Sequence, residues 1–169
     1  PVLDLNPHNY GPIIASLLRD PRLTELGPGS PNRANRGELA LLTPERMFPS
    51  VSDRSMALAC IYGLWLYHDF LDESHRISQD LHTTTGSYWH GILHRREPDA
   101  SNSKYWFRQV GRHPVFEELT AETGQQWDPF AFIDHCEDVR GSGSDAELAC
   151  RRLQLREWEL LFDWCFRKA

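Results

Sequence analysis

The stretch that decides the fold is residues 52–81, SDRSMALACIYGLWLYHDFLDESHRISQDL, the longest segment of the chain with helical apolar periodicity. Ser52 or Asp53 can cap its start. With about 100° of rotation per residue, one side of this helix carries apolar and polar side chains together. The members of that side are Leu58, Ile61, Leu64, Trp65, His68, Leu71, Asp72, His75 and Gln79. The sequence therefore predicts one long central helix that ends near Leu81.

Capping and helix-stopping residues mark further helices on both sides of this segment. Thr43-Pro44 starts a short helix, because threonine caps well and proline suits the first helical position. Ser144 and Glu147 have the spacing of a capping box, which opens a final helix. Pro98 and Gly111 are suited to end the two helices that follow the central one. Helices are thus expected over residues 13–19, 87–97, 102–110 and 144–167, and from Asp128-Pro129 onward.

No stretch of useful length alternates apolar and polar residues as a half-exposed strand would. A chain of 169 residues fits one domain, since chains of about 150 residues bury roughly 70% of the surface that they expose when unfolded. The predicted fold class is all-α, a single compact domain like a helical bundle, with about six helices. Within residues 1–169, we expect 1–50 to be loosely structured, 52–112 to form the core helices that carry the motifs, and 144–167 to form the C-terminal helix.

The composition argues against several classes of protein. The net charge is −6, from 24 acidic and 18 basic residues, so the chain as a whole does not attract nucleic acid. A hydrophobic fraction of 40%, with six Trp and eight Phe, is too high for a disordered chain. No apolar run approaches the roughly 20 residues of a membrane span. Because the first residues also lack a secretory signal pattern, we expect a cytoplasmic protein without a nucleic acid or membrane partner.

The cysteines do not have the spacing of a known motif. Cys60, Cys136, Cys150 and Cys165 include no C-x-x-C pair, the spacing of zinc knuckles and redox motifs. Three of them lie in apolar helical stretches, where a free cysteine behaves as a small hydrophobic residue. We therefore expect reduced thiols, although a disulfide stays open at this point.

Two polar strips stand out on the expected helices. His68, Asp72, His75 and Gln79 are spaced by four, three and four residues, so they follow one side of the central helix. His90, His94 and Glu97 form a similar strip on the next helix. Ionisable groups among apolar residues cost several kcal/mol unless they are paired or bind a metal. If the two helices are antiparallel neighbours, as a connection of about five residues favours, both strips line one cavity.

Three interpretations of these strips remain open. In the first, a divalent metal (Zn, Mn or Fe) is bound by imidazoles and a carboxylate, with His68, Asp72, His75, His90 and His94 as the candidate ligands. In the second, the site is free of metal, and His75, His90, His94 and Glu97 are the catalytic acid–base residues. In the third, the same groups form a structural network of buried hydrogen bonds that fixes the helix register.

The residues around the second strip indicate a small-molecule ligand. Arg95, Arg96 and Arg108 are candidates to receive a negatively charged substrate, because guanidinium groups bind anions well. Asn102 and the aromatic residues Trp89, Tyr105 and Trp106 complete the candidate substrate-binding set. The alternative is that individual arginines pair with nearby carboxylates on the surface. At least one of the three arginines is expected to stay inside, bonded to a carboxylate.

The central 45 or so residues also carry a recognisable combination of patterns. The chain reads D-x-L-D-x-S-H-x-I-x-Q, then W-H-x-x-x-H-R-R-E-P-D, then N-x-K-Y-W-F-R. This combination resembles a family of small, all-α microbial proteins to which no activity is attached. The resemblance implies that the residues carrying it share one site: His75, His90, His94, Glu97, Asp99, Asn102 and Arg108.

Together these features favour an enzyme that acts on a small anionic molecule through a pocket of histidine, carboxylate and arginine side chains. With a bound divalent metal, hydrolysis is the reaction class that fits. The alternative is a module without catalysis, which binds a small molecule or another protein and whose buried polar network is structural.

Overall fold

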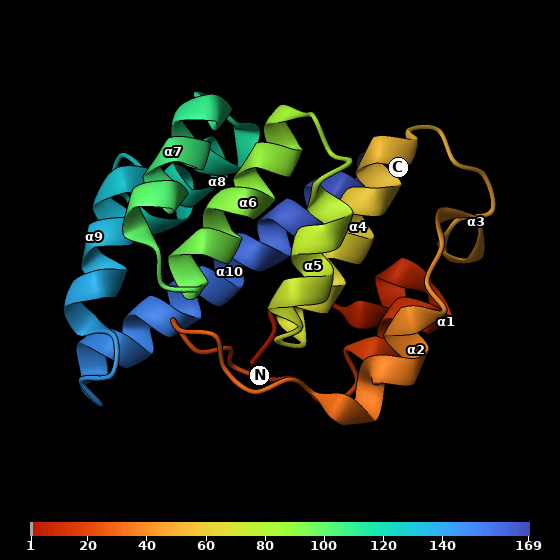
Figure 1. The fold of residues 1–169 in the computed structure, drawn as a ribbon, viewed down its shortest axis with the longest axis horizontal. Coiled ribbons are helices and arrows are strands. Elements are labelled where there is room, and N and C mark those ends of the chain that lie inside the picture. Colours follow the sequence, from red (N-terminus) through yellow and green to blue (C-terminus); the bar gives the residue numbers. More distant parts are fainter. Residues whose placement is uncertain (1) are drawn as a thin grey trace.

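The computed structural model describes residues 2–169, so Pro1, where the expected N-terminal region begins, lies outside the described residues. These residues form ten α-helices, two short 3₁₀-helices and no strand (Figure 1). The elements are η1 (Pro7–Tyr10), α1 (Gly11–Leu17), η2 (Arg33–Asn35), α2 (Arg36–Ala40), α3 (Pro44–Met47), α4 (Arg54–Tyr67), α5 (Leu71–Ser78), α6 (Thr84–Arg96), α7 (Ala100–Val110), α8 (Pro114–Thr123), α9 (Pro129–Val139) and α10 (Asp145–Lys168). The all-α prediction is confirmed, and the estimate of about six helices is too low.

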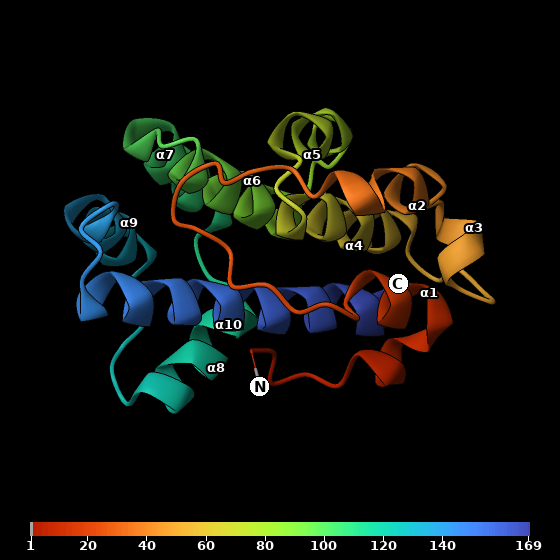
Figure 2. The same cartoon turned by 90° about the horizontal axis from the view of Figure 1, so that it is seen from below.

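The longest helix, α10, runs along the length of the molecule (Figure 2). Its 24 residues span about 36 Å at 1.5 Å per residue. The Ser144 hydroxyl caps it by accepting a hydrogen bond from the Glu147 backbone N–H at 3.2 Å, as the capping box predicts. In Figure 2, α4, α6 and α7 lie on one side of α10 and α8 lies on the other. Helix α10 is therefore buried on several sides, and Trp158, Leu161 and Phe162 lie in the core.

The expected single helix over residues 52–81 is wrong, because the chain breaks between α4 and α5. Asp53 caps α4 as predicted, accepting from the Met56 N–H at 3.2 Å, and the helix continues to Tyr67. Asp69 then has φ = 65°, in the left-handed region that aspartate tolerates better than most residues. Its carboxylate accepts hydrogen bonds from Arg96 and Arg22, which stabilise this conformation. After the break, α5 follows a new direction and packs against α6 (Figure 1).

Helices α6 and α7 form a close pair that positions much of the site (Figure 1). Thr83 caps α6 and Asp99 caps α7, each accepting a backbone N–H three residues later. The two backbones approach at Gly91, whose carbonyl accepts a hydrogen bond from Ser103 Oγ at 2.6 Å. A Cβ at Gly91 would lie 2.5 Å from the Phe107 ring, so only glycine fits this crossing.

The first 50 residues, expected to be loosely structured, contain α1, α2 and α3 and an irregular segment that is tied to the helices. In Figure 2 this segment, residues 18–32 (here the strap), runs back along α10 before it reaches α2. Arg151 donates to the carbonyls of Leu23 and Thr24, and Gln154 donates to that of Glu25. These three backbone acceptors of the strap are thus satisfied by side chains of α10.

The number of helices also exceeds the prediction because α2 and α8 were not expected. Helix α8 begins at Pro114, and its cap is the His113 imidazole, whose Nδ1 accepts from the Val115 N–H at 3.2 Å. Histidine is not among the common capping residues, which explains why the pattern gives no start signal there. Among residues 2–169, no helix is both long enough and apolar enough to cross a membrane.

Candidate functional site

Three histidine side chains from two helices converge on the outer side of α6. His90 and His94 are one turn apart on α6, with ring centroids separated by 6.3 Å. His75, on α5, lies against both of them, with its ring centroid 5.8 Å from that of His90 and 5.6 Å from that of His94. The packing of α5 on α6 therefore brings together three of the histidines that the sequence singled out.

His90 is the most enclosed member of this group. Its Nδ1 lies 3.1 Å from the Gly86 carbonyl, which can only accept, so Nδ1 carries a proton. Its Nε2 lies 2.7 Å from Ser78 Oγ, and the Trp106 ring stacks on the imidazole at 4.0 Å. Burial, together with the neighbouring histidines, lowers the pKa of His90 to about 4. At neutral pH this imidazole is therefore uncharged.

His94 stands at the end of α6 beside two carboxylates. Its Nδ1 lies 2.8 Å from Glu97 Oε2, and 9% of its side chain is exposed, against 35% for that of Glu97. Asp99, the cap of α7, completes a group whose possible ligand atoms all lie within 4.8 Å of one another. One imidazole and two carboxylates at this spacing could hold a metal ion, because a single ion can reach all three.

His75 has the most freedom to act on a ligand. It is half-buried, and within residues 2–169 neither of its ring nitrogens has a hydrogen-bond partner. One ring nitrogen of a neutral imidazole accepts a proton and the other donates one. His75 can therefore bind a metal, donate a hydrogen bond or exchange a proton without disturbing a contact inside the protein.

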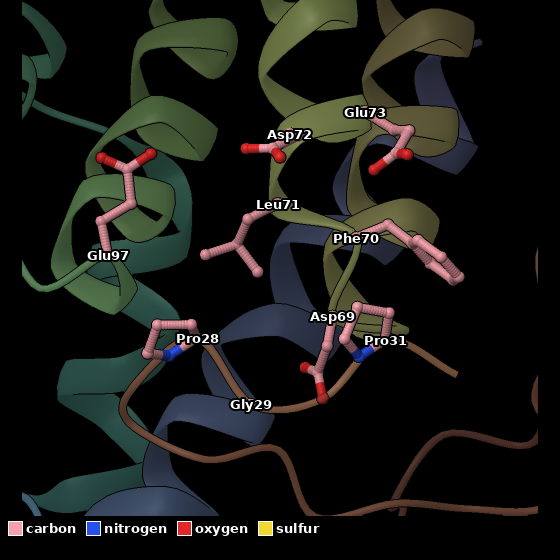
Figure 3. Close-up of a pocket in the computed structure, with 9 residues that line it drawn as sticks. All are labelled: Pro28, Gly29, Pro31, Asp69, Phe70, Leu71, Asp72, Glu73 and Glu97. Carbon is pink, nitrogen blue, oxygen red and sulfur yellow. The ribbon is translucent and has the colours of Figure 1, made fainter. Parts of the chain in front are cut away.

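Two surface hollows flank these histidines. One has a volume of about 330 Å³ and is lined by His75, Ser78, Ser87, His90 and Trp106, among others. The other has a volume of about 310 Å³ and lies between α5, the end of α6 and the strap (Figure 3). In Figure 3, Asp72 and Glu97 face each other across it, and Glu73 and Asp69 add two further carboxylates. The first hollow is aromatic and largely uncharged, whereas the second is acidic.

The structure places His68 away from this group. It lies in the break between α4 and α5, where its Nε2 donates to the Leu17 carbonyl at 3.0 Å. Its Nδ1 accepts a hydrogen bond from Asn32 Nδ2 at 3.1 Å. Burial lowers the pKa of His68 to about 4, consistent with a neutral ring whose two nitrogens are both engaged. The metal-ligand role expected for His68 is therefore corrected, because the break in the helix turns it towards the strap and α1.

The two arginines of α6 are also inside the protein, as was expected for at least one arginine. Arg95 pairs with Glu157 of α10 at 2.5 Å, and both side chains are fully buried. Arg96 pairs with Asp69 at 2.5 Å and also donates to the Leu66 carbonyl at 2.9 Å. Both guanidinium groups hold helices together, so the expectation that they receive a substrate from solvent is corrected. Arg108, the third candidate, is exposed on α7.

The remaining candidate residues differ in how deeply they are buried. Tyr105 and Trp106 line the aromatic hollow, and Tyr105 is 47% exposed. Asn102 is exposed, and its side chain donates to Asp99 Oδ2 at 3.1 Å. Trp89 is fully buried, next to Tyr62 and Gly63, so its expected place in a substrate wall is corrected.

Ser78 is the functional candidate that the sequence reasoning missed. It lies at the end of α5, is buried, lines the aromatic hollow and touches His90 Nε2 through its hydroxyl. A signal for it was present, because Ser78 follows His75 by three residues and so lies on the same side of α5.

Comparisons of the chain with protein-family models, with curated proteins and with solved structures found no match. The geometry of the site is therefore the basis on which a function can be assigned.

Proposed function

We propose that the chain is an enzyme that binds a divalent transition metal at His94, Glu97 and Asp99 and acts on a small molecule held beside His75. The observation that carries this proposal is the close group of one imidazole and two carboxylates, with two further imidazoles next to it. Metal-dependent hydrolysis is the reaction class that suits these groups best, because a bound divalent ion makes water a nucleophile at neutral pH.

The chemistry of the three groups supports a metal of the Zn, Mn or Fe type. Imidazole and carboxylate are common ligands of these ions, and a site with three protein ligands keeps positions for water and substrate. The group also lies at the C-terminal end of α6, where the helix dipole favours a cation. Asp72, on the wall of the neighbouring acidic hollow, adds to the negative potential around the site (Figure 3).

His75 is the residue best suited to move a proton in this site. Its unpaired nitrogens and its place on the wall of the aromatic hollow put it where a substrate would bind. If the reaction needs no metal, His94 takes the role of general base, and Glu97 orients it through the 2.8 Å contact to Nδ1.

The aromatic hollow supports a small molecule as the substrate. Trp106 gives it a flat wall, and Ser87, on α6, offers a hydroxyl group. Arg108 is the one exposed member of the three arginines that were expected to receive an anion. An anionic substrate would therefore depend on Arg108 and on the charge of the metal. The resemblance to the microbial family is carried in part by His75, His90, His94, Glu97 and Asp99. We propose that these residues form a site that the family shares.

A module that binds a ligand without catalysis is the second candidate. The observation that favours it is that His90, the most enclosed imidazole, is neutral and has both nitrogens engaged inside the protein. In that case the aromatic hollow would hold a small molecule, and the polar groups beneath it would only keep α5 in place.

Metal analysis of protein purified without a histidine tag tests the proposal. We expect one divalent ion for each chain, or an increase in the melting temperature when Zn²⁺, Mn²⁺ or Fe²⁺ is added to protein treated with a chelator. Substoichiometric metal together with an unchanged melting temperature would rule out the metal site.

Variants locate the ion within the protein. Glu97→Gln and Asp99→Asn keep the size of each side chain but remove its charge, so each should weaken metal binding by 10-fold or more, by analogy with the roughly 10–100-fold effects of groups around metal ligands. His135→Gln is the matched control, because His135 is exposed on α9, on a different part of the surface. Equal losses in all three variants would place the ion elsewhere.

A further inference from the structure

Two cysteine side chains meet in a part of the protein that the proposed site does not use. Cys136 on α9 and Cys150 on α10 are 14 positions apart in the chain, and their Sγ atoms lie 3.4 Å apart. Both are buried, with Leu26 and Phe132, in a small apolar cluster separate from the main core. Two thiols in contact can form a disulfide bond with each other, which a single buried thiol cannot do.

A buried cation lies beside this pair. Arg95 is fully buried, and its Nε–H has no hydrogen-bond partner among residues 2–169, although its terminal nitrogens bind Glu157 and Gln154. The contact with Cys150, in which either sulfur can donate, lowers the pKa of Cys136, burial opposes this, and the Arg95 charge lowers the pKa further. The Glu157 charge raises the pKa of Cys136, and the Arg140 charge lowers it. The pKa of Cys150 is raised by its contact with Cys136. Cys136 is therefore the thiol of the pair that ionises more readily.

We propose that Cys136 and Cys150 form a modification site that closes to a disulfide when hydrogen peroxide reaches the pair. The inference is independent of the proposed function, because no residue of the histidine group takes part in it. It assigns Cys136 as the residue that attacks the oxidant and Cys150 as the residue that resolves the product.

The reaction balances with peroxide as the only oxidant. The Cys136 sulfur attacks one peroxide oxygen, so that an S–O bond forms and the O–O bond breaks. Hydroxide leaves and combines with the proton from the Cys136 thiol to give water. The Cys150 sulfur then attacks the sulfenic acid, so that the S–S bond forms, the S–O bond breaks and a second water leaves with the Cys150 proton. The two thiols lose two electrons, and the peroxide gains them.

The geometry allows this closure with a small movement. A disulfide bond is about 2.0 Å long, so the sulfur atoms must approach each other by about 1.4 Å. The connection between α9 and α10 is exposed, and it contains Gly141 and Gly143 with φ values of 76° and 66°. Because this segment is not packed into the core, it can adjust when the helices shift.

The other two cysteines are a matched control inside the same chain. Cys60 on α4 and Cys165 on α10 are also neighbours, and burial followed by the contact with Cys165 raises the pKa of Cys60. The charge that acts on Cys60 is that of Asp163, which is negative and disfavours the thiolate. We therefore expect peroxide to oxidise Cys136 and Cys150 before it oxidises Cys60 and Cys165.

The test uses the reduced, folded, full-length protein. After treatment with hydrogen peroxide, free thiols are blocked with N-ethylmaleimide in denaturant, and tryptic peptides are analysed by mass spectrometry. The expected result is a cross-linked pair of peptides that contains Cys136 and Cys150, with a mass lower by two hydrogen atoms, while Cys60 and Cys165 carry the label. The proposal is overturned if all four thiols stay labelled, or if Cys60 and Cys165 link first.

Variants then assign the two roles. Cys150→Ser should leave Cys136 oxidised to a sulfenic acid that dimedone traps, whereas Cys136→Ser should leave Cys150 reduced at the same dose. Cys60→Ser should form the Cys136–Cys150 link as the wild type does. Circular dichroism checks that each variant is folded. If a variant does not fold, the experiment on the wild-type protein still shows whether the Cys136–Cys150 disulfide forms. Trapping of Cys150 in Cys136→Ser as fast as Cys136 is trapped in Cys150→Ser would contradict the assignment.

Discussion

Asp69 Oδ1 and Arg96 Nη2 lie 2.5 Å apart inside the protein, although their residues are 27 positions apart in the chain. Only 3% of the Asp69 side chain and 2% of the Arg96 side chain are exposed. The second carboxylate oxygen of Asp69 accepts from Arg22 at 2.6 Å, so one carboxylate joins α6 to the strap. This contact fixes the break between α4 and α5, and the break is what places His75 beside His90 and His94.

Asp69→Asn tests the importance of this contact. Asparagine tolerates the left-handed backbone, so the variant removes the charge and leaves the conformation allowed. Because Arg96 would stay buried without its anion, the free energy of unfolding should fall by about 3–5 kcal/mol, as when other buried ion pairs are broken. Urea unfolding measures this loss. Glu45→Gln, at an exposed ion pair with Arg54, is the control and should unfold close to the wild-type midpoint.

Much of the helical framework could be predicted from local signals. Thr43-Pro44, Asp128-Pro129 and the Ser144 capping box each start a helix where the sequence indicates, because a cap acts within one turn. The break at Asp69 could not be predicted, since the apolar periodicity continues through it. Its cause is a partner on α6 and another on the strap, and their approach depends on the tertiary structure.

The candidate site, too, could be predicted only in part. Helical spacing put His90 and His94 on one side of α6, and the short connection placed α5 beside them. The same spacing could not show that His68 would bind Leu17 and Asn32, or that Arg95 would face Glu157. In each case the partner is distant in sequence, so whether the polar group serves a ligand or the fold is decided by packing.

Gly91→Ala tests the close approach of α6 and α7. The new Cβ would lie 2.5 Å from the Phe107 ring, so the helices or the ring must move, and overpacking of this kind costs about 1–3 kcal/mol. A lower melting temperature and a weaker Ser103–Gly91 contact are expected. Gly37→Ala is the matched control, because no atom of the described residues 2–169 outside its own helix backbone and chain neighbours lies within 4 Å of its added Cβ. It should be neutral, or more stable by up to about 1 kcal/mol, since alanine favours a helix over glycine. Equal destabilisation in both variants would show that packing at Gly91 is not tight.

The buried histidines predict a loss of stability in mild acid. Burial lowers the pKa of His68, His90 and His113 to about 4, whereas an imidazole in an unfolded chain titrates near about 6.5. Below about pH 6.5 the unfolded chain binds protons that the folded chain does not, so the free energy of unfolding falls until about pH 4. Above about pH 6.5 the stabilising contribution of each histidine is fully present. Between about pH 6.5 and about pH 4, each histidine lowers the free energy of unfolding by up to about 3 kcal/mol.

Urea unfolding at several pH values between about 7 and 4.5 measures this slope. His113→Asn separates one histidine from the carboxylates that titrate in the same range, because asparagine can still cap α8 but does not titrate. The variant should take up about one proton fewer on unfolding at about pH 5. An unchanged slope would mean that His113 is protonated in the folded protein, which its acceptor contact with the Val115 N–H opposes.

Trp106→Ala tests what keeps His90 neutral. The Trp106 ring covers one face of the imidazole at 4.0 Å, and burial is the largest cause of the lowered pKa of His90. Removal of the ring should admit water, so this pKa should rise from about 4 towards the usual value of about 6.5. The NMR titration of the imidazole signals measures the change. Tyr105→Ala is the control, because Tyr105 contacts the edge of Trp106 and is 47% exposed. A midpoint that stays near 4 in a folded Trp106→Ala protein would assign the enclosure of His90 to Ser78 and α5 instead, because these are its other neighbours in the hollow.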